Sequence, residues 1–304
     1  MRPLQVGLVL ATGDTGAERI PARWHEIRDL ALRAEELGFD TVWVPDELLW
    51  RSAPGKERGF WDGVAMAGAI TAVTSRVRVG TWVMSALHRN PGIIAKAVET
   101  LDEISGGRFV FGLGAGHEWP GQARAFGLPE DHIYQRFEEA LEIIVPLLRS
   151  GHAEFEGTWH TARDLAQRPV GPRPGAIPIM IAGHGPKGLR HAARLADIWS
   201  CYAEERSDLD ELGPRVTALE AACAEVGRDP ATIGRSAGIE VAPLARAGDP
   251  DAPKGAITGP AEDIVERFRA FHAAGYTQLE VMLDPQTTAA LEALVPVLEL
   301  LDAD

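Results

Sequence analysis

The sequence predicts an α/β protein of the (β/α)8 TIM-barrel class, and three observations support this prediction. Apolar runs of strand length alternate with longer segments of helical periodicity, and the alternation recurs eight times along the 304 residues. Such alternation is typical of a parallel sheet covered by helices. Eight units in a chain of this length favour a closed barrel, and a doubly wound open sheet is the alternative. Because no low-complexity linker divides the sequence, we expect a single domain over residues 1–304, with an insertion around 151–176.

The predicted strands are short and mostly apolar, which suits strands that are buried on both faces. In chain order they are 6–10, 41–44, 77–84, 109–113, 177–182, 197–201, 233–241 and 279–282.

The predicted helices have apolar residues three and four positions apart. In chain order they are 22–37, 61–73, 93–104, 136–148, 186–195, 209–226, 260–274 and 287–301. Gly38 ends the first helix, Asn90 and Pro91 begin the third, and Ser105-Gly106-Gly107 ends it. The stretch 151–176 is rich in glycine, proline and polar residues, and we expect it to be irregular.

Composition and charge exclude several classes of function. The formal net charge of −14 disfavours binding to nucleic acid or to anionic membranes. Cys201 and Cys223 are too few for a disulfide framework, and their spacing does not suit a metal site. The sequence has no secretory leader pattern and no apolar run of transmembrane length, so we expect a soluble, cytoplasmic protein.

In a barrel of this class, chemistry is carried by the loops that follow the strands. After the second strand come Asp46 and Glu47, with Trp50 nearby. Two carboxylates there could transfer a proton or orient a ligand. A solvated loop or an acidic helix start is the alternative interpretation.

The third strand ends in Gly80-Thr81-Trp82, which indicates an irregular backbone that shapes a pocket. His88 and Arg89 follow and could bind an anion or move a proton. A surface or capping role for His88 is the alternative.

The fourth strand carries glycines at alternate positions, Gly112, Gly114 and Gly116, followed by His117. Alternate glycines let the backbone approach a ligand closely, or they only relieve crowding at the barrel rim. A dinucleotide-binding fingerprint needs a third glycine that opens a helix, whereas Trp119 and Pro120 stand here.

The fifth strand leads into a glycine-rich turn, 182–185, and a helix that opens at Pro186. The start of a helix presents N–H groups and the positive end of the helix dipole, which together bind phosphate. Lys187 and Arg190 could add positive charge, although a plain turn would also tolerate these glycines.

Several other functional motifs are absent from the sequence. Histidines are scattered without metal-ligand spacing, so no metal site is predicted. The sequence also has no nucleophile elbow of the serine hydrolases and no phosphate loop of the NTPases.

Several of these motifs, taken together, resemble the luciferase-like monooxygenase family, and they occur in the family's order over nearly the whole chain. They are the run 101–109 with 112–116, the pair 80–81 with 89–91, and the segments 182–186, 196–199 and 257–263. Members of the family use FMN or the deazaflavin coenzyme F420. The sequence looks closer to the deazaflavin branch.

This resemblance implies roles for individual residues. The cofactor ring should lie at the end of the third strand, where the family often has a non-proline cis peptide, here Trp82–Val83. Asp46 should lie near the polar edge of the ring. The ring pocket and the phosphate loop involve further residues: Ser85, Gly116 and His117 for the pocket, and Ala182, Gly183, His184, Gly185 and Lys187 for the loop.

The proton donor is the point at which this sequence departs from the family pattern. Deazaflavin enzymes often have Asp-His after the second strand, whereas this chain has Asp46-Glu47. A carboxylate donates a hydrogen bond only when it is protonated. Either the acid is a protonated Glu47, or His117 or His88 transfers the proton, or the function differs from that of the deazaflavin enzymes. Trp50 and Trp119 are candidates for the walls of a substrate pocket.

The function expected from the resemblance is hydride transfer between F420 and a small organic substrate. The alternative is an FMN-dependent monooxygenase that relies on a separate flavin or F420 reductase. A barrel that binds flavin without turnover is a third possibility. The resemblance also implies a homodimer.

Overall fold

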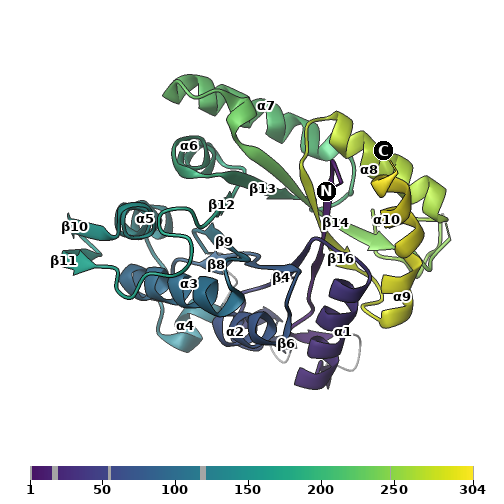
Figure 1. Ribbon diagram of the computed structural model, residues 1–304, viewed down its shortest axis with the longest axis horizontal. Coiled ribbons are helices and arrows are strands. Elements are labelled where there is room, and N and C mark those ends of the chain that lie inside the picture. Colours follow the sequence, from purple (N-terminus) through teal and green to yellow (C-terminus); the bar gives the residue numbers. More distant parts are fainter. Residues whose placement is uncertain (1, 16–19, 54–55, 117–120, 247, 304) are drawn as a thin grey trace. The chain divides into compact units, whose positions relative to one another are not determined.

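The structure is a computed structural model that describes residues 2–15, 20–53, 56–116, 121–246 and 248–303 (Figure 1). The main sheet has the strand order β12-β13-β14-β16-β1-β4-β7-β9-β8, and β12 also pairs with β9. The order therefore closes on itself, which defines the (β/α)8-barrel class and excludes an open doubly wound sheet. The strands of this ring are β1 (Gln5–Val9), β4 (Thr41–Val44), β7 (Arg78–Thr81), β9 (Phe109–Gly114), β12 (Ile179–Ala182), β13 (Ile198–Tyr202), β14 (Gly234–Ala242) and β16 (Gln278–Leu283).

Helices follow the strands in the alternation that the sequence predicts. They are α1 (Trp24–Glu36), α2 (Gly63–Val73), α3 (Pro91–Ser105), α4 (Gln122–Phe126), α5 (Ile133–Ser150), α6 (Pro186–Leu195), α7 (Leu209–Val226), α8 (Ala261–Ala273), α9 (Thr288–Ala293) and α10 (Val295–Asp302). A short 3-10 helix, η1, covers Pro230–Thr232. The caps of α3 are as predicted, because the Asn90 side chain accepts hydrogen bonds from Gly92 and Ile93, and Gly106 ends the helix in the left-handed conformation.

By its internal contacts the chain divides into two compact units. The first unit comprises 1–10, 25–43 and 180–304, and the second comprises 11–24 and 44–179. A single domain over 1–304 remains a prediction.

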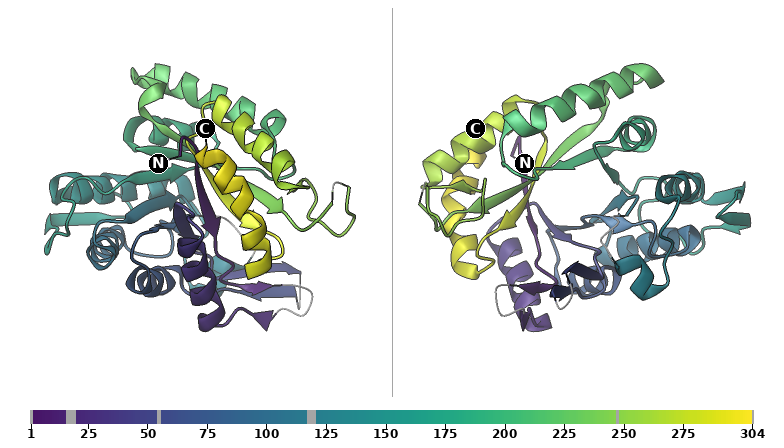
Figure 2. Two further views of the ribbon diagram at one scale, coloured as in Figure 1. Left: turned by 45° about the vertical axis from the view of Figure 1, so that its right-hand side comes forward. Right: turned by 180° about the vertical axis from the view of Figure 1, so that it is seen from behind.

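The first unit is built on parallel pairing of β1 with β4 and β16, and of β14 with β13 and β16. Helices α7, α8 and α10 lie on the outer side of these strands in all the views (Figures 1 and 2). Large aromatic side chains fill the core: Trp43, Trp199, Tyr276, Phe268 and Phe271 are all at most 2% exposed. At the centre of β1, Gly7 makes room for the Trp43 indole, since a Cβ on Gly7 would lie 2.4 Å from Trp43 Nε1.

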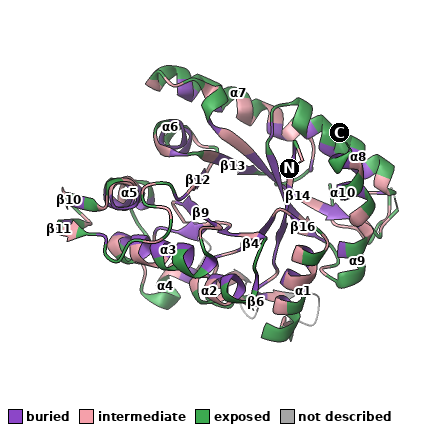
Figure 3. Cartoon of the chain, viewed as in Figure 1, coloured by how far each residue is buried: buried purple, intermediate pink, exposed green. Residues whose placement is uncertain are grey.

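The second unit contains β7 and β9 with α2, α3 and α5. All of β9 is buried, while the outer faces of α3 and α5 are exposed (Figure 3). At the start of β9, Arg108 ties the connection between α2 and β7 in place by donating hydrogen bonds to the carbonyl oxygens of Thr71, Thr74 and Val77.

The third strand was predicted to run without a break over 77–84, and this prediction is wrong. It divides into β7 and β8 (Met84–Ser85), because the backbone turns at Trp82–Val83. Both pieces pair in parallel with β9.

The irregular stretch expected at 151–176 contains an antiparallel hairpin instead, formed by β10 (His152–Glu156) and β11 (Thr161–Ala166). It extends beside α5 (Figures 1 and 2). Glu139 of α5 anchors the turn of this hairpin by accepting hydrogen bonds from the backbone N–H groups of 158–160. The hairpin was missed because its pattern is polar and short, and its anchor lies outside it in the sequence.

Further short pairs lie among the connections: β2 (Asp14–Thr15) with β3 (Ile20–Pro21), β5 (Leu49–Ala53) with β6 (Lys56–Gly59), and β15 (Ile257–Thr258) beside β14. The predicted closing helix is two helices, α9 and α10, and a proline stands in the first turn of α10. A proline at this position begins a helix readily but cannot continue the preceding one.

Candidate functional site

The backbone bends sharply at the end of the third barrel strand. The Trp82–Val83 peptide is cis, as predicted from the resemblance. Trp82 N–H donates a hydrogen bond to the carbonyl oxygen of Val44 at 2.8 Å, which ties the bend to the end of β4. Residues that follow β4 and residues that follow β7 are therefore neighbours in the second unit.

Asp46 is the centre of a buried charge network at these strand ends. Its fully buried carboxylate accepts hydrogen bonds from both terminal nitrogens of Arg89, at 2.6 and 3.0 Å, and from Ser85 N–H at 3.0 Å. Arg89 also reaches Asp62 at 2.7 Å. Arg89 had been a candidate for binding an anion, and the anions that it binds here are two carboxylates of the protein itself.

The ionised form of Asp46 is stabilised by this network. Burial alone would raise the pKa of Asp46, but the neighbouring His88 and the hydrogen-bonded Arg89 outweigh burial and hold that pKa below its ordinary value. The pKa of Arg89 is affected in the opposite sense. Burial would lower it, and the bond to Asp46 raises it above its ordinary value. Both groups therefore remain charged at neutral pH.

Helix α2 packs tightly against the same carboxylate. Asp62 caps the helix by accepting a hydrogen bond from Ala65 N–H. A Cβ on Gly63, the next residue, would lie 2.6 Å from the carbonyl oxygen of Pro45 and 2.9 Å from Asp46 Oδ1. Neither residue was predicted from the sequence, although Asp62 stands immediately before the apolar run of α2, which is an N-cap signal.

His88 lies inside this cluster, not on the surface. Its side chain is 6% exposed, and its Nδ1 atom lies 3.4 Å from Asp46 Oδ2. On the other side of the ring, Nε2 lies 3.3 Å from the side-chain nitrogen of Gln122 in α4. Gln122 was not predicted from the sequence, because its short helix has no distinctive pattern.

The alternate glycines of β9 face other side chains of the second unit. A Cβ on Gly114 would lie 2.9 Å from Val83, and a Cβ on Gly116 would lie 2.7 Å from Ser85 Oγ. Gly116 also has a positive φ of 94°. Relief of crowding therefore accounts for both glycines, and it holds Val83 and Ser85 against the end of β9.

The other predicted residues of this region are placed only in part. Glu47 is half-buried and lies between Asp46 and the start of β5. Trp50 lies in β5, and its ring packs against Phe60 with centroids 4.9 Å apart. His117 and Trp119 lie outside the described residues.

In the first unit, the predicted phosphate loop joins β12 to α6. Helix α6 begins at Pro186 as predicted, and no side chain caps it. Gly183 has a φ of 143°, which favours glycine, whereas a Cβ there would lie at an ordinary contact distance of 3.7 Å from the Cα of Gly188. The Trp199 indole fixes the turn by donating a hydrogen bond to the carbonyl oxygen of Gly183 at 2.8 Å.

The remaining residues of this loop are accessible. Ala182 and Gly185 are half-buried, whereas His184 and Lys187 are exposed. The imidazole of His184 lies 3.7 Å from a carboxylate oxygen of Glu204. Backbone N–H groups are thus the main donors that this turn offers.

Carboxylates that the sequence analysis did not select lie at other strand ends of the first unit. Glu240 lies near the end of β14 in register with Met282, and Asp284 follows β16. Burial, and then the charge of Asp284, raise the pKa of Glu240 above its ordinary value. The strand-end rule applied to β14 and β16 would have found both residues.

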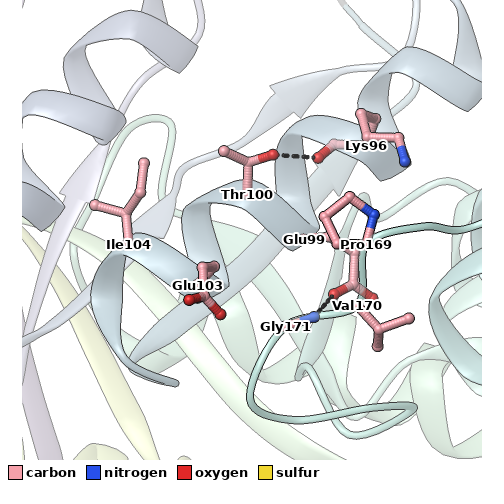
Figure 4. Close-up of a pocket in the computed structure, with 8 residues that line it drawn as sticks. All are labelled: Lys96, Glu99, Thr100, Glu103, Ile104, Pro169, Val170 and Gly171. Atoms are coloured by element: carbon pink, nitrogen blue, oxygen red, sulfur yellow. Dashed lines mark hydrogen bonds between the residues drawn. The ribbon is translucent and has the colours of Figure 1, made fainter.

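Other features of the described chain lie away from these strand ends. A groove on the outer face of α3 is lined by Lys96, Glu99, Thr100, Glu103, Ile104, Pro169, Val170 and Gly171 (Figure 4). Within the described residues, no cluster of His, Cys, Asp and Glu is arranged to hold a metal ion. Among the described helices, none is both long and apolar enough to cross a membrane.

A (β/α)8 barrel has its functional residues at the carboxyl ends of its strands, and in this chain those ends carry the Asp46 network in the second unit and an uncapped helix start after β12 in the first. The family model for luciferase-like monooxygenases matches residues 4–248. The chain belongs to that family.

Named relatives are similar to this chain in sequence, and solved structures are similar to it in fold. The chain is 32% identical over 207 residues to a protein of Amycolatopsis mediterranei named F420-dependent glucose-6-phosphate dehydrogenase, and the match covers 63% of this chain and 58% of the relative. A solved F420-dependent secondary alcohol dehydrogenase in complex with an F420-acetone adduct is similar in fold, with a TM-score of 0.79 at 19% identity and 98% coverage of both chains. The monooxygenase RslO1 of Streptomyces bottropensis has a TM-score of 0.77 at 19% identity, with 97% of this chain and 99% of that chain covered.

Proposed function

We propose that this protein is an F420-dependent oxidoreductase that transfers a hydride between the deazaflavin and a small organic substrate. The observation that carries the proposal is the relationship to proteins named F420-dependent glucose-6-phosphate dehydrogenase, including 32% and 33% identity to those of Kineococcus radiotolerans and Beutenbergia cavernae. The chain spans little more than half the length of these relatives, at 54% and 52%.

The residues present fit such a cofactor in two respects. The turn 182–185 offers backbone donors at an uncapped helix start, which suits a phosphate group. The region around the cis peptide offers Trp82, Val83 and Ser85 on a backbone held rigidly by the Asp46–Arg89 pair. We propose that the first group binds the phosphate and that the second contacts the ring.

When bound, F420 supplies a carbon that gives or takes the hydride. The chain's own task is to orient the reactants, exclude water and hold one proton. The Asp46 carboxylate accepts hydrogen bonds from Arg89 and from Ser85 N–H. It therefore positions Ser85 and does not itself transfer the proton. Glu47, His117 and His88 are the proposed proton donors, with Trp50 and Trp119 as the proposed walls of the substrate pocket.

Titration of the purified protein with F420 and with FMN, followed by fluorescence, tests the cofactor. We expect F420 to bind and FMN to bind far more weakly. Lys187→Ala should weaken F420 binding by about tenfold, the effect of losing one charge-assisted hydrogen bond. Lys254→Ala, at another exposed lysine of the first unit, is the matched control. Tight binding of FMN without F420 binding would overturn the proposal.

An FMN-dependent monooxygenase is the second candidate, favoured by the name of the family and by the fold of RslO1. It would draw reduced flavin from a separate reductase. An oxygen-consumption assay distinguishes this candidate from an F420-dependent enzyme. It uses chemically reduced FMN with a panel of small alcohols, aldehydes and sugar phosphates, and only the monooxygenase should consume dioxygen. Cofactor binding without turnover across the whole panel would instead favour a non-catalytic barrel.

We further propose a cytoplasmic homodimer. The outer face of α3 supports the dimer, because Ile104 on it is 46% exposed and Val170 beside it is 44% exposed (Figure 4). Exposed apolar side chains grouped on one face are typical of an interface. Light scattering should give twice the chain mass, and Ile104→Glu should shift it toward the monomer.

A further inference from the structure

Gln122 holds a fixed orientation in the second unit. Its side-chain oxygen accepts hydrogen bonds from the backbone N–H groups of Leu48 and Leu49, at 3.1 and 2.8 Å. Because both partners are donors, the atom that faces them is the oxygen of the amide, and the NH2 group points the other way. The residue is only 4% exposed, so water does not compete for these bonds.

The orientation of Gln122 determines which nitrogen of His88 carries the proton. The Gln122 NH2 group lies 3.3 Å from His88 Nε2, and an amide NH2 group can only donate. His88 Nε2 must therefore accept, which leaves the ring neutral with its proton on Nδ1. His88 Nδ1 lies 3.4 Å from Asp46 Oδ2, close enough for a charge–dipole contact but without the alignment of a hydrogen bond, and the carboxylate can only accept.

Two anchors, one on each side in the sequence, hold the backbone around Glu47. On one side Asp46 is held by Arg89 and Ser85, and on the other side the backbone of Leu48 and Leu49 is held by Gln122. His88 joins the two anchors, since it contacts both Asp46 and Gln122. The backbone of Glu47 is thereby fixed at both ends.

We propose that Gln122 and His88 are a positioning pair: they hold Glu47 in place as the proton-transferring group, and His88 itself stays neutral with its proton on Nδ1. The role of Glu47 rests on the proposed function, whereas the protonation state of His88 does not. Of the three sequence-derived candidates for the proton donor, the geometry removes His88.

The state of His88 is tested by NMR of protein labelled with nitrogen-15 at histidine, with His88 assigned by comparison with His88→Asn. We expect wild-type His88 at pH 7 to show a protonated Nδ1 and an unprotonated Nε2. Gln122→Glu keeps an acceptor for Leu48 and Leu49 but places a second acceptor at His88 Nε2. In that variant we expect both ring nitrogens to be protonated. A wild-type ring protonated at Nε2 would overturn the proposal.

The role of Glu47 is tested by turnover with F420. Glu47→Gln should lower kcat by roughly 10²–10⁴-fold, the usual contribution of a general acid or base. His88→Asn keeps a donor toward Asp46 without a titrating ring, and it should lower kcat by less than about tenfold. A loss in His88→Asn as large as that in Glu47→Gln would contradict the positioning role. Nearly unchanged kcat in Glu47→Gln would do so as well.

The variant Gln122→Met tests whether Gln122 positions Glu47 for catalysis or only stabilises the fold. It removes the acceptor of Leu48 and Leu49, so kcat should fall by about tenfold or more while the Kd for F420 changes little. Recovery of kcat in Gln122→Glu, with a shifted pH profile, is expected because the backbone acceptor returns while His88 becomes charged. If neither F420 nor FMN binds the wild-type protein, the proposed function fails. The NMR result then still decides the state of His88.

Discussion

The second unit contains two buried aspartate–arginine pairs that are alike in chemistry and different in place. Asp46 and Asp102 both have fully buried side chains, and each accepts hydrogen bonds from two nitrogens of one arginine, Arg89 or Arg173. Arg173 also donates to the carbonyl oxygen of Phe109, the first residue of β9, at 2.6 Å. The Asp46 pair instead follows the end of β4 and holds Ser85.

We infer that position, and not the type of pair, separates a structural role from the proposed functional one. In this class of barrel, residues at the amino ends of strands serve stability, and residues at the carboxyl ends serve the site. The Asp102 pair fixes where β9 begins. The Asp46 pair fixes the backbone of Glu47 and of the residues proposed to contact the cofactor ring.

Removing the arginine of each pair gives the largest expected effects. Arg89→Met leaves Asp46 buried without its main partner, so we expect the free energy of unfolding to fall by about 3–5 kcal/mol and turnover to be lost. Urea unfolding and F420 reduction measure the two effects.

Arg173→Met should cost a similar 3–5 kcal/mol of stability, because Asp102 is just as buried. The folded fraction should nevertheless keep its kcat and its Kd for F420. A fall in kcat as large as that in Arg89→Met, measured where both variants are folded, would remove the distinction between the two pairs.

A smaller effect is expected from a methyl group at Gly63. In Gly63→Ala the new Cβ meets Pro45 and Asp46 backbone or carboxylate atoms at less than 3 Å, so we expect a loss of about 1–3 kcal/mol and reduced activity. Gly68→Ala in the same helix is the matched control. Its Cβ would meet only Leu101, at 3.7 Å, and removal of an interior helical glycine should stabilise by up to about 1 kcal/mol. Equal outcomes at both positions would show that Gly63 makes no special contact.

These pairs also show what could be predicted from the sequence. Strand and helix positions follow from periodicity, and the resemblance located the cis peptide at Trp82–Val83. The partner of Asp46 did not follow, because Arg89 is 43 residues away and no local pattern joins the two. The roles of Gly114 and Gly116 depend on which side chains lie opposite them, and Gln122 acts through backbone groups 73 and 74 residues before it. Such contacts are set by tertiary packing, which periodicity does not encode.

The smallest expected effects come from two strand-end carboxyl groups whose pKa values shift in opposite directions. The folded-state pKa of Asp46 is lowered, so its stabilisation is complete above the unfolded pKa of about 3.9 and is lost only as the pH falls through the lower folded value. The stability difference between wild type and Asp46→Asn should therefore be constant from about pH 7 to 5 and shrink below about pH 4.

The folded-state pKa of Glu240 is raised by burial and by Asp284, so the sign reverses. Its unfolded form ionises first, near pH 4.3, and wild type should lose stability as the pH rises from there through the higher folded value. Glu240→Gln lacks this loss, so its stability relative to wild type should increase over that window and then stay constant. Because Glu240 is only half-buried, water screens the effect and the change should be small. Unfolding by urea at a series of pH values measures how the stability of wild type relative to each variant changes with pH. Slopes of the same sign for Asp46 and Glu240 would contradict the contrast between a paired carboxylate and one facing a like charge.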